Sequence, residues 1–325
     1  MKVPRDDVTP EQWRALEQDA VAVHRTDETV LRLTGPGRVE CVQGLVTCDV
    51  VKPGDNSHMF GALLNTKGMV VSPLRITRLT DQIIVTLPRV AEVQVGEILT
   101  RSLPPRLCRF EDVTDQADAI GWYGARADEH AETGGAALGA GQVAREDAEG
   151  LLTLQMRAVA RGVPGVEMIM MPGGLRHTPA AAARPVMGHE NLLEACRILA
   201  GIPALGAEID EKTLPQEVRY EELGAISYTK GCYLGQETVA RLHFRGHANR
   251  TLALLLLDRE PTVPDEVRAG EKVVGRLTSA TWSEDLDAWV GQAVLRREAE
   301  EGAEVTLGAG GSAVVRRDRW PREAS

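Results

Sequence analysis

The chain contains 325 residues, of which 43% are hydrophobic, 26% charged and 4% aromatic, and its formal net charge is −10 at pH 7. This length exceeds that of most single domains, so we expect two or more packed units with largely aliphatic cores. The acidic composition argues against an extended nucleic-acid-binding surface, and the longest aliphatic run, at residues 252–257, is too short to cross a bilayer.

The five cysteines do not form the pattern of a disulfide framework or of a common metal site. Their number is odd, their spacings are wide, and no C-x-x-C pair occurs. We therefore expect no metal ligand set and a reducing, cytoplasmic location. Cys41 and Cys48 lie in apolar surroundings, which predicts packing roles for both. The stretch MKVPRDDVTPEQW at the start is polar and acidic, so we expect no signal peptide there.

The N-terminal part of the chain predicts a mixed α+β unit. Thr9 and Gln12 form a capping box with Pro10 between them, which predicts a helix start. An order of strand, helix, strand, strand, helix and strand is typical of the split βαβ, or ferredoxin-like, arrangement. The elements predicted from the sequence follow this order with one additional strand between the helices: a strand ending at Gly35, a helix within 36–46, two strands joined by the turn 65–68, a strand at 81–88, a helix at 89–103 and a strand at 106–114.

A second round of the same arrangement is expected downstream. Its helix ends at Gly201 and Pro203, both of which stop helices. The elements are predicted as strands at 119–125, 151–160 and 166–172, a flexible loop at 131–141, and a helix at 190–203.

The pattern changes after Arg250. Short strands then alternate with Gly, Pro and acidic turns and no helix signal intervenes, which predicts a small antiparallel barrel of roughly eighty residues. The predicted fold class is therefore α+β, with two ferredoxin-like subdomains in residues 1–248 and a C-terminal β-barrel in residues 249–325.

The stretch SYTKGCYLGQETVAR, residues 227–241, places Cys232 in a polar turn flanked by glycines. The reactive form of a thiol is the thiolate, which a nearby cation or a helix N-terminus favours. Lys230 lies two residues before Cys232 and a helix is expected to begin near Gly235, so we expect an accessible, reactive thiol. The alternative is that Cys232 is a small buried hydrophobe, as many free cysteines are.

Two carboxylates are candidate ligand contacts. Glu167 stands at the mouth of a strand that is otherwise apolar, and Glu208 lies in the stretch AGIPALGAEID. A carboxylate can accept two hydrogen bonds from the paired N–H groups of an aminopyrimidine-type heterocycle. The alternative for both residues is a charge at the edge of an element that faces water.

Other common sites are not expected. His243 and His247 are four residues apart, but Gly246 lies between them and Arg245 adds a positive charge, so we expect a solvated or ligand-facing pair instead of a metal site. The chain has no G-x-G-x-x-G after a strand, no P-loop and no G-x-S-x-G. Dinucleotide, triphosphate-cleaving and serine-hydrolase functions therefore lack support.

The stretch KGCYLGQETVAR resembles the signature K-G-C-Y-x-G-Q-E-x-x-A-R of the YgfZ-type folate-binding proteins. These are relatives of the glycine-cleavage T-protein, a tetrahydrofolate-dependent aminomethyltransferase. Further similarity lies, in the family's order, at residues 35–50, 63–76, 197–218, 244–250 and 274–298.

The resemblance implies three subdomains around a central opening that holds tetrahydrofolate or a derivative. It also implies a function in making or repairing iron–sulfur clusters in client enzymes, with a link to tRNA modification through those enzymes. The functional residues would be Cys232 and Lys230, and the folate contacts Glu167, Glu208, Tyr233, Gln236, Glu237 and Arg241. Whether Cys232 acts as a nucleophile, a transient metal ligand or a redox thiol stays open.

One departure separates this chain from the T-protein. Aminomethyltransferases carry an Asn-Ala stretch and a catalytic Asp after the strand that matches 81–88, whereas this chain continues with RVAEVQVGEIL. We therefore expect a folate-binding accessory factor for iron–sulfur client proteins, with no membrane partner. The alternative is a true aminomethyltransferase acting on a lipoyl carrier protein. Direct tRNA binding through Arg241, Arg245 and Arg250 is a third hypothesis, which the acidic charge makes the least favoured.

Overall fold

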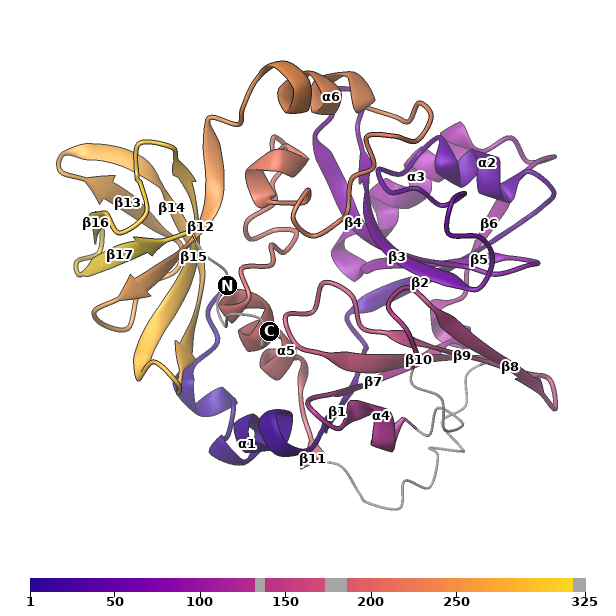
Figure 1. Ribbon diagram of the computed structural model, residues 1–325, viewed down its shortest axis with the longest axis horizontal. Helices are drawn as coiled ribbons and strands as arrows, with labels where there is room; N and C mark the ends of the chain where they lie inside the picture. The colour runs from indigo at the N-terminus through magenta and orange to yellow at the C-terminus, as the bar shows by residue number, and fades with distance from the viewer. Residues whose placement is uncertain (132–137, 173–185, 318–325) are drawn as a thin grey trace.

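The structure is a computed structural model that describes residues 1–131, 138–172 and 186–317. It contains two β-sheets with helices on their faces and a closed β-barrel, so the predicted α+β class is confirmed. Figure 1 shows the two sheets on one side of the molecule, the barrel on the other, and helices α5 (Glu190–Leu199) and α6 (Gln236–Arg245) between them. Within these ranges no helix is both long and apolar enough to span a membrane. The predicted loop at 131–141 falls largely outside them.

The first sheet is antiparallel, with the strand order β3-β4-β5-β2-β6. Two helices cover one face, where Val42 and Val95 join Leu33 and Ile76 in one core. Three strands, one more than in the split βαβ motif, lie between the helices. In chain order the elements are β2 (Glu28–Thr34), α2 (Arg38–Gln43), β3 (Ser57–Leu64), β4 (Val70–Arg78), β5 (Ile83–Pro88), the 3-10 helix η2 (Arg89–Ala91), α3 (Glu92–Ser102) and β6 (Arg109–Asp112).

The turn between β3 and β4 lies at residues 65–68, as predicted. Asn65 Oδ1 accepts a hydrogen bond of 2.9 Å from the Lys67 N–H, and Gly68 has a φ of 84°, in the left-handed region that favours glycine. A Cβ atom at Gly68 would lie only 2.8 Å from the Cβ of Thr238 in helix α6. The glycine therefore also lets this hairpin touch a segment far away in the sequence.

The second sheet has the order β11-β1-β7-β10-β9-β8, and only the β1–β11 pair is parallel among its described pairs. Every residue of β10 is buried, as predicted for the strand at 166–172. The elements are β1 (Val21–His24), the 3-10 helix η3 (Thr114–Gln116), β7 (Asp118–Tyr123), α4 (Ala127–His130), β8 (Val143–Ala148), β9 (Leu151–Arg157), β10 (Gly165–Met171) and β11 (Val186–Met187).

The N-terminus forms a 3-10 helix, η1 (Arg5–Asp7), and helix α1 (Pro10–Gln18). Helix α1 begins with the predicted capping box. Thr9 Oγ1 accepts from the Gln12 N–H at 3.2 Å, and Gln12 Oε1 accepts from the Thr9 N–H at 3.0 Å. Helix α1 then packs with helix α5 (Glu190–Leu199) in a core that includes Leu16 and Leu192.

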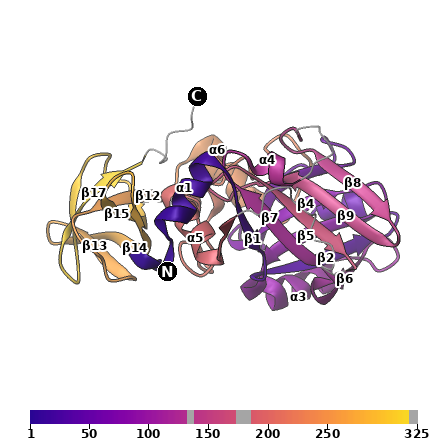
Figure 2. The ribbon, with the colours of Figure 1, turned by 90° about the horizontal axis from the view of Figure 1, so that it is seen from below.

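The two sheets pack face to face. Val30 and Ile84 of the first sheet share a core with Leu154 and Ile169 of the second. Figure 2 shows this pair of sheets at one end of the molecule and the barrel at the other. Charged side chains placed between the sheets must therefore find partners there, because water is excluded.

The C-terminal unit is a closed barrel with the order β12-β15-β14-β13-β16-β17, which confirms the predicted antiparallel barrel. Its interior is aliphatic and includes Leu255, Val267, Leu277 and Leu295. The strands are β12 (Arg250–Leu257), β13 (Asp265–Ala269), β14 (Lys272–Ser283), β15 (Ala288–Arg296), β16 (Glu304–Leu307) and β17 (Ser312–Arg316). Between helix α5 and the barrel lie the 3-10 helix η5 (Pro215–Val218) and helix α6 (Gln236–Arg245).

Glu208 joins helix α5 to the barrel. Its fully buried carboxylate accepts hydrogen bonds from Arg197 Nη1 at 2.9 Å, the Ala204 N–H at 3.0 Å, Thr278 Oγ1 at 2.7 Å and Ser279 Oγ at 2.5 Å. Four donors engage both oxygens, so the geometry does not support the prediction that Glu208 contacts a ligand. We assign it a structural role at this junction.

We expect the substitution Glu208→Gln to lower the free energy of unfolding by about 1–3 kcal/mol, because the buried Arg197 would keep only Glu194 as a carboxylate partner and the remaining donors would lose a charged acceptor. Chemical denaturation measures the effect. The control is Glu211→Gln at an exposed position, expected to change stability by no more than about 0.5 kcal/mol. Equal effects of the two substitutions would contradict the role assigned to Glu208.

Candidate functional site

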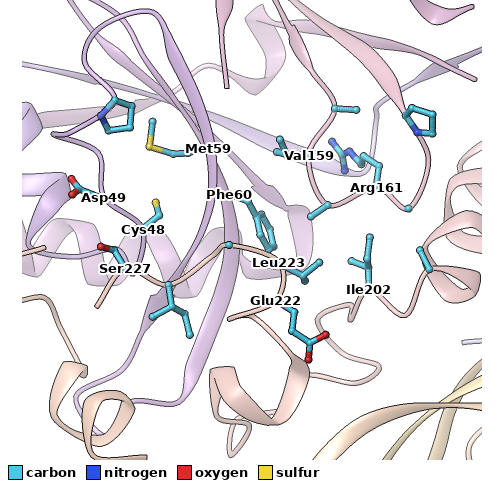
Figure 3. A pocket seen from close by; sticks show the side chains of 18 of the residues that line it. Cys48, Asp49, Met59, Phe60, Val159, Arg161, Ile202, Glu222, Leu223 and Ser227 are labelled. Atoms are coloured by element: carbon cyan, nitrogen blue, oxygen red, sulfur yellow. The ribbon is translucent and has the colours of Figure 1, made fainter. Parts of the chain in front are cut away.

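A cavity of about 1420 Å³, here called the central cavity, lies where the two sheets meet the segment that follows helix α5. Its volume exceeds the roughly 300–1,000 Å³ of most small-molecule sites. Residues from β3, from 158–164 and from 222–229 supply most of its wall, as Figure 3 shows. The cavity is large enough for a cofactor-sized ligand. Its apolar lining includes Met59, Phe60, Val159, Ile202, Leu223 and Ile226.

A second cavity of about 370 Å³ adjoins the first. Both cavities are lined by Phe60, Ala160, Arg161 and Ile202, so these four residues form the boundary between them. Buried charged groups face this boundary from the second cavity, whereas aliphatic groups dominate the central cavity.

Arg161 is the centre of a buried network of charges. Its Nε donates to Glu167 Oε1 at 2.6 Å, and its two terminal nitrogens donate to the two oxygens of Glu28 at 2.8 and 3.1 Å. Arg75 Nη1 donates to Glu28 Oε1 at 3.0 Å, and the Tyr123 hydroxyl donates to Glu167 Oε1 at 2.6 Å. Because Glu28 starts β2 and Glu167 lies on β10, the network connects the two sheets.

The network keeps both of its carboxylates ionised at neutral pH. Burial by itself raises the pKa of Glu167, but the cations Arg161 and Arg75 outweigh burial and lower that pKa to about 2. Burial likewise opposes ionisation of Glu28, whose pKa is held well below its ordinary value of 4.5 by Arg161 and by the neighbouring arginines. Breaking one ion pair would therefore leave an uncompensated charge in a dry site.

The structure places Glu167 outside the walls of both cavities. This carboxylate accepts a hydrogen bond from Arg161 and lines neither cavity. The structure therefore does not place it where it would directly contact a ligand in either cavity. Arg161, in contrast, lines both cavities and is held by its hydrogen bond to Glu167. The sequence reasoning missed Arg161, Glu28 and Arg75. For Glu28 and Arg75 the available signal was a charge within an otherwise apolar strand, because such a charge requires a buried partner; Arg161 lies between β9 and β10, where this signal is absent.

Cys232 is exposed, which excludes the alternative of a buried packing residue. Ser227, Tyr228 and Thr229, a few residues earlier, line the central cavity, whereas Cys232 itself does not. Helix α6 begins at Gln236, close to the predicted start. The thiol therefore lies on the outer surface, on a loop whose preceding residues form a wall of the cavity.

Gly235 precedes helix α6 with a φ of 79°, and a Cβ atom there would lie 2.5 Å from the carbonyl oxygen of Asn65. Together with Gly68 of the β3–β4 turn, it allows the two backbones to touch. The Cys232 loop thus rests directly on the first sheet's hairpin.

Lys230 anchors the same loop from the other side. Its buried ammonium donates to the carbonyl oxygens of Gln43 at 2.6 Å, Val46 at 2.6 Å and Cys48 at 2.8 Å. Burial lowers the pKa of Lys230 to about 8, so the ammonium stays largely protonated at neutral pH. These bonds do not support the predicted catalytic use of Lys230. We assign it as a positioning residue that fixes the loop carrying Cys232.

The other signature residues also lie outside both cavities. Tyr233 is buried, and Gln236 Oε1 accepts a hydrogen bond of 3.2 Å from its N–H. Glu237 and Arg241 are exposed on helix α6, because the buried Val239 turns the opposite face of the helix inward. The structure therefore does not bring these four predicted contact residues to the wall of either cavity.

The two histidines are not paired. Helix α6 ends at Arg245, before His247, and the His243 ring stacks on Tyr228 with a centroid distance of 3.6 Å. His243 Nδ1 lies 3.2 Å from Glu221 Oε1. In the part of the chain that the structure describes, no three His, Cys, Asp or Glu side chains are grouped as metal ligands.

Arg250 is also engaged. Its guanidinium donates to both oxygens of Glu217, at 2.7 and 3.2 Å, so the hypothetical tRNA patch is reduced to Arg241 and Arg245.

Cys48 lines the central cavity, in addition to the packing role predicted for it. Its sulfur fits against Gly61, where a Cβ atom would approach to 2.6 Å, and Figure 3 shows the side chain at the cavity wall. Burial raises the pKa of Cys48 to about 12. At neutral pH this thiol is therefore protonated and forms part of the wall.

The substitution Arg161→Met is expected to destabilise the fold most at neutral pH, by about 3–5 kcal/mol, because Glu28 and Glu167 would lose their shared cation. Depressed carboxyl pKa values contribute stability above the ordinary value of 4.5, and this contribution is lost as the pH falls towards about 2. In the variant both carboxyls take up protons more easily, so its deficit should shrink on acidification.

Urea denaturation at about pH 7.5 and about pH 4.5 measures this deficit. Arg126→Met, which removes an exposed ion pair with Glu129, is the control and is expected to change stability by less than about 1 kcal/mol. A deficit of the Arg161 variant that is independent of pH would contradict the electrostatic explanation.

Two comparisons with known proteins bear on this fold. Residues 250–316, which form the barrel, match the family described as the glycine cleavage T-protein C-terminal barrel domain. The whole chain resembles the glycine cleavage system aminomethyltransferase T from Bartonella henselae, with a TM-score of 0.78, 16% identity, and coverage of 95% of this chain and 88% of that one.

A heterotetrameric sarcosine oxidase from a Corynebacterium species aligns with 55% of this chain and 83% of its own, at 12% identity and a TM-score of 0.34. From the first two comparisons, the barrel is similar to the T-protein C-terminal barrel domain, and the fold of the chain is similar to that of aminomethyltransferase T.

Proposed function

We propose that this chain binds a tetrahydrofolate in the central cavity and supports the assembly or repair of iron–sulfur clusters in client enzymes. The observation that carries the proposal is the position of Cys232: an exposed thiol on a firmly anchored loop that borders a cofactor-sized cavity, in a fold like that of aminomethyltransferase T. A consequence for tRNA modification would follow indirectly, through the client enzymes.

The residues present suit a pteridine. Phe60 and the aliphatic side chains around it offer an apolar surface for a flat ring. Arg161 has five N–H donors, of which three are used by Glu28 and Glu167, so two remain for the ring's oxygen and nitrogen acceptors. A bound tetrahydrofolate would supply a carrier for one-carbon units.

Exposure of Cys232 fits a step that involves a second protein. A client enzyme is too large to enter the cavity, but it can reach a sulfur on the outer surface. Cys48, in contrast, is buried and protonated, and its position suits contact with a small ligand only. Lys230 supports the step by holding the loop in one conformation.

The alternative function is that of a tetrahydrofolate-dependent aminomethyltransferase, which the fold favours. The aspartate expected after strand β5 is missing, and Arg89 and Val90 occupy that position beside the second cavity. The next acid, Glu92, accepts a hydrogen bond of 3.1 Å from Thr29 Oγ1. We therefore expect no ammonia release from an aminomethylated carrier protein in the presence of tetrahydrofolate, and steady turnover would establish the alternative.

Reduced folate is expected to raise the melting temperature, because a ligand at a hundredfold excess over its Kd stabilises by about 2.7 kcal/mol. The substitution Phe60→Ala should diminish the shift, whereas Phe244→Ala, at an exposed position outside both cavities, should not. Each variant is compared with its own ligand-free melting temperature. Absence of any shift for the unsubstituted protein at millimolar folate would remove the folate part of the proposal.

Replacing Cys232 with alanine should change stability by no more than about 0.5 kcal/mol, because the side chain is exposed. The variant should nevertheless fail to restore iron–sulfur enzyme activity in a strain that lacks the protein. The matched control is Cys41→Ala, at a partly buried thiol away from the cavity, which should still rescue. Full rescue by the Cys232 variant would show that this sulfur is dispensable.

A further inference from the structure

We infer that Lys52 binds the carboxylate of the glutamate portion of a folate at the mouth of the central cavity. This inference rests on the proposed folate function and names the residue that would recognise the anionic end of the ligand. Lys52 is exposed and lies in the loop between helix α2 and strand β3.

Four of the described residues that line the central cavity are charged: Asp49, Lys52, Arg161 and Glu222. Arg161 is neutralised by Glu28 and Glu167, as described above. Glu222 accepts hydrogen bonds of 2.9 Å at both oxygens from Arg219 Nε. These two side chains therefore carry charges that the fold itself compensates.

Asp49 is compensated in a different way. Its Oδ1 accepts hydrogen bonds from Gln43 Nε2 at 3.1 Å, the Val51 N–H at 2.9 Å and the Lys52 N–H at 3.1 Å. Its carboxylate is thus used to fix the backbone of the loop. Burial by itself raises the pKa of Asp49, but these backbone hydrogen bonds outweigh burial and leave the pKa below its ordinary value.

The ammonium of Lys52 makes no hydrogen bond or ion pair with any of the residues that the structure describes. Its backbone, however, is held rigidly. In addition to the bond with Asp49, Arg78 Nη1 donates to the carbonyl oxygens of Val50 at 2.9 Å and Val51 at 3.0 Å. A fixed loop therefore presents an unpaired cation at the solvent edge of a cavity whose other charges are compensated.

The arrangement matches the chemistry of a folate. A pteridine needs a flat apolar surface with hydrogen-bond donors, which Phe60 and the buried Arg161 supply at the inner end. The opposite end of a folate is a glutamate with two carboxylates, and an exposed ammonium is a suitable partner for them. Asp49 belongs to the same loop as Lys52. In Figure 3 Asp49 and Arg161 lie on opposite sides of the cavity.

The volume of the cavity supports the same assignment. At about 1420 Å³ it has room for a ligand longer than a pteridine and its benzoyl ring.

The test measures the Kd of two ligands by titration calorimetry: tetrahydropteroate, which lacks glutamate, and tetrahydropteroylglutamate, the monoglutamate. The unsubstituted protein should bind the monoglutamate about 3- to 10-fold more tightly than the pteroate, and this ratio should fall with added salt. Lys52→Gln should bind both ligands with equal affinity and leave the affinity for pteroate unchanged. Lys52→Arg should retain the preference.

The control is Lys212→Gln, at an exposed lysine that lines neither cavity, and it should behave like the unsubstituted protein. A preference for glutamate that survives in Lys52→Gln would overturn the inference while leaving folate binding intact. If the unsubstituted protein binds neither ligand, the proposed function fails, and the inference fails with it.

Discussion

The ion pairs of Arg161 are the interaction on which the arrangement of this molecule depends. Glu28 belongs to the first sheet and Glu167 to the second, and both carboxylates are held by the same guanidinium. Charges that are removed from water are tolerated only when each has a partner in good geometry. The two sheets therefore cannot slide past one another without exposing an unpaired charge to a dry environment, and the boundary between the two cavities is fixed as a result.

Side chains also hold the irregular segment between helix α5 and the barrel, where few backbone ladders are available. Glu208 attaches the start of this segment to β14, and Lys230 attaches its end to the carbonyl groups that follow helix α2. Each anchor replaces the hydrogen bonds that a helix or strand would otherwise provide. The Cys232 loop can thus be exposed and still occupy a defined position, which is what a reaction with a large partner requires.

The sequence predicted the features that depend on neighbouring residues. The capping box of Thr9 and Gln12, the turn at 65–68 and the short strands of the barrel all follow local rules of backbone geometry, and all three were confirmed. The polar, glycine-flanked turn predicted an accessible thiol at Cys232, and this side chain is exposed. The same stretch did not indicate which way the surrounding side chains point.

The remaining features depend on residues far apart in the chain. Glu28 and Arg161 are separated by 133 positions, and Lys230 and Gln43 by 187, so no local pattern relates them. For this reason Glu167 and Glu208 were expected at the ligand, although distant partners engage both. Cys48 was predicted only as a packing residue, because an apolar sequence context does not distinguish a core position from one that lines an apolar cavity.

The contact between Gly68 and Gly235 has a consequence for recognising similar chains. A side chain at either position would force the hairpin and the start of helix α6 apart, and the loop with Cys232 would lose one of its two supports. The cysteine signature therefore describes the Cys232 loop but not the β3–β4 turn on which this loop rests. A search pattern that also requires the Asn-x-x-Gly turn would select chains that hold the sulfur in the same way. It would exclude chains that have the cysteine signature on a loop without this support.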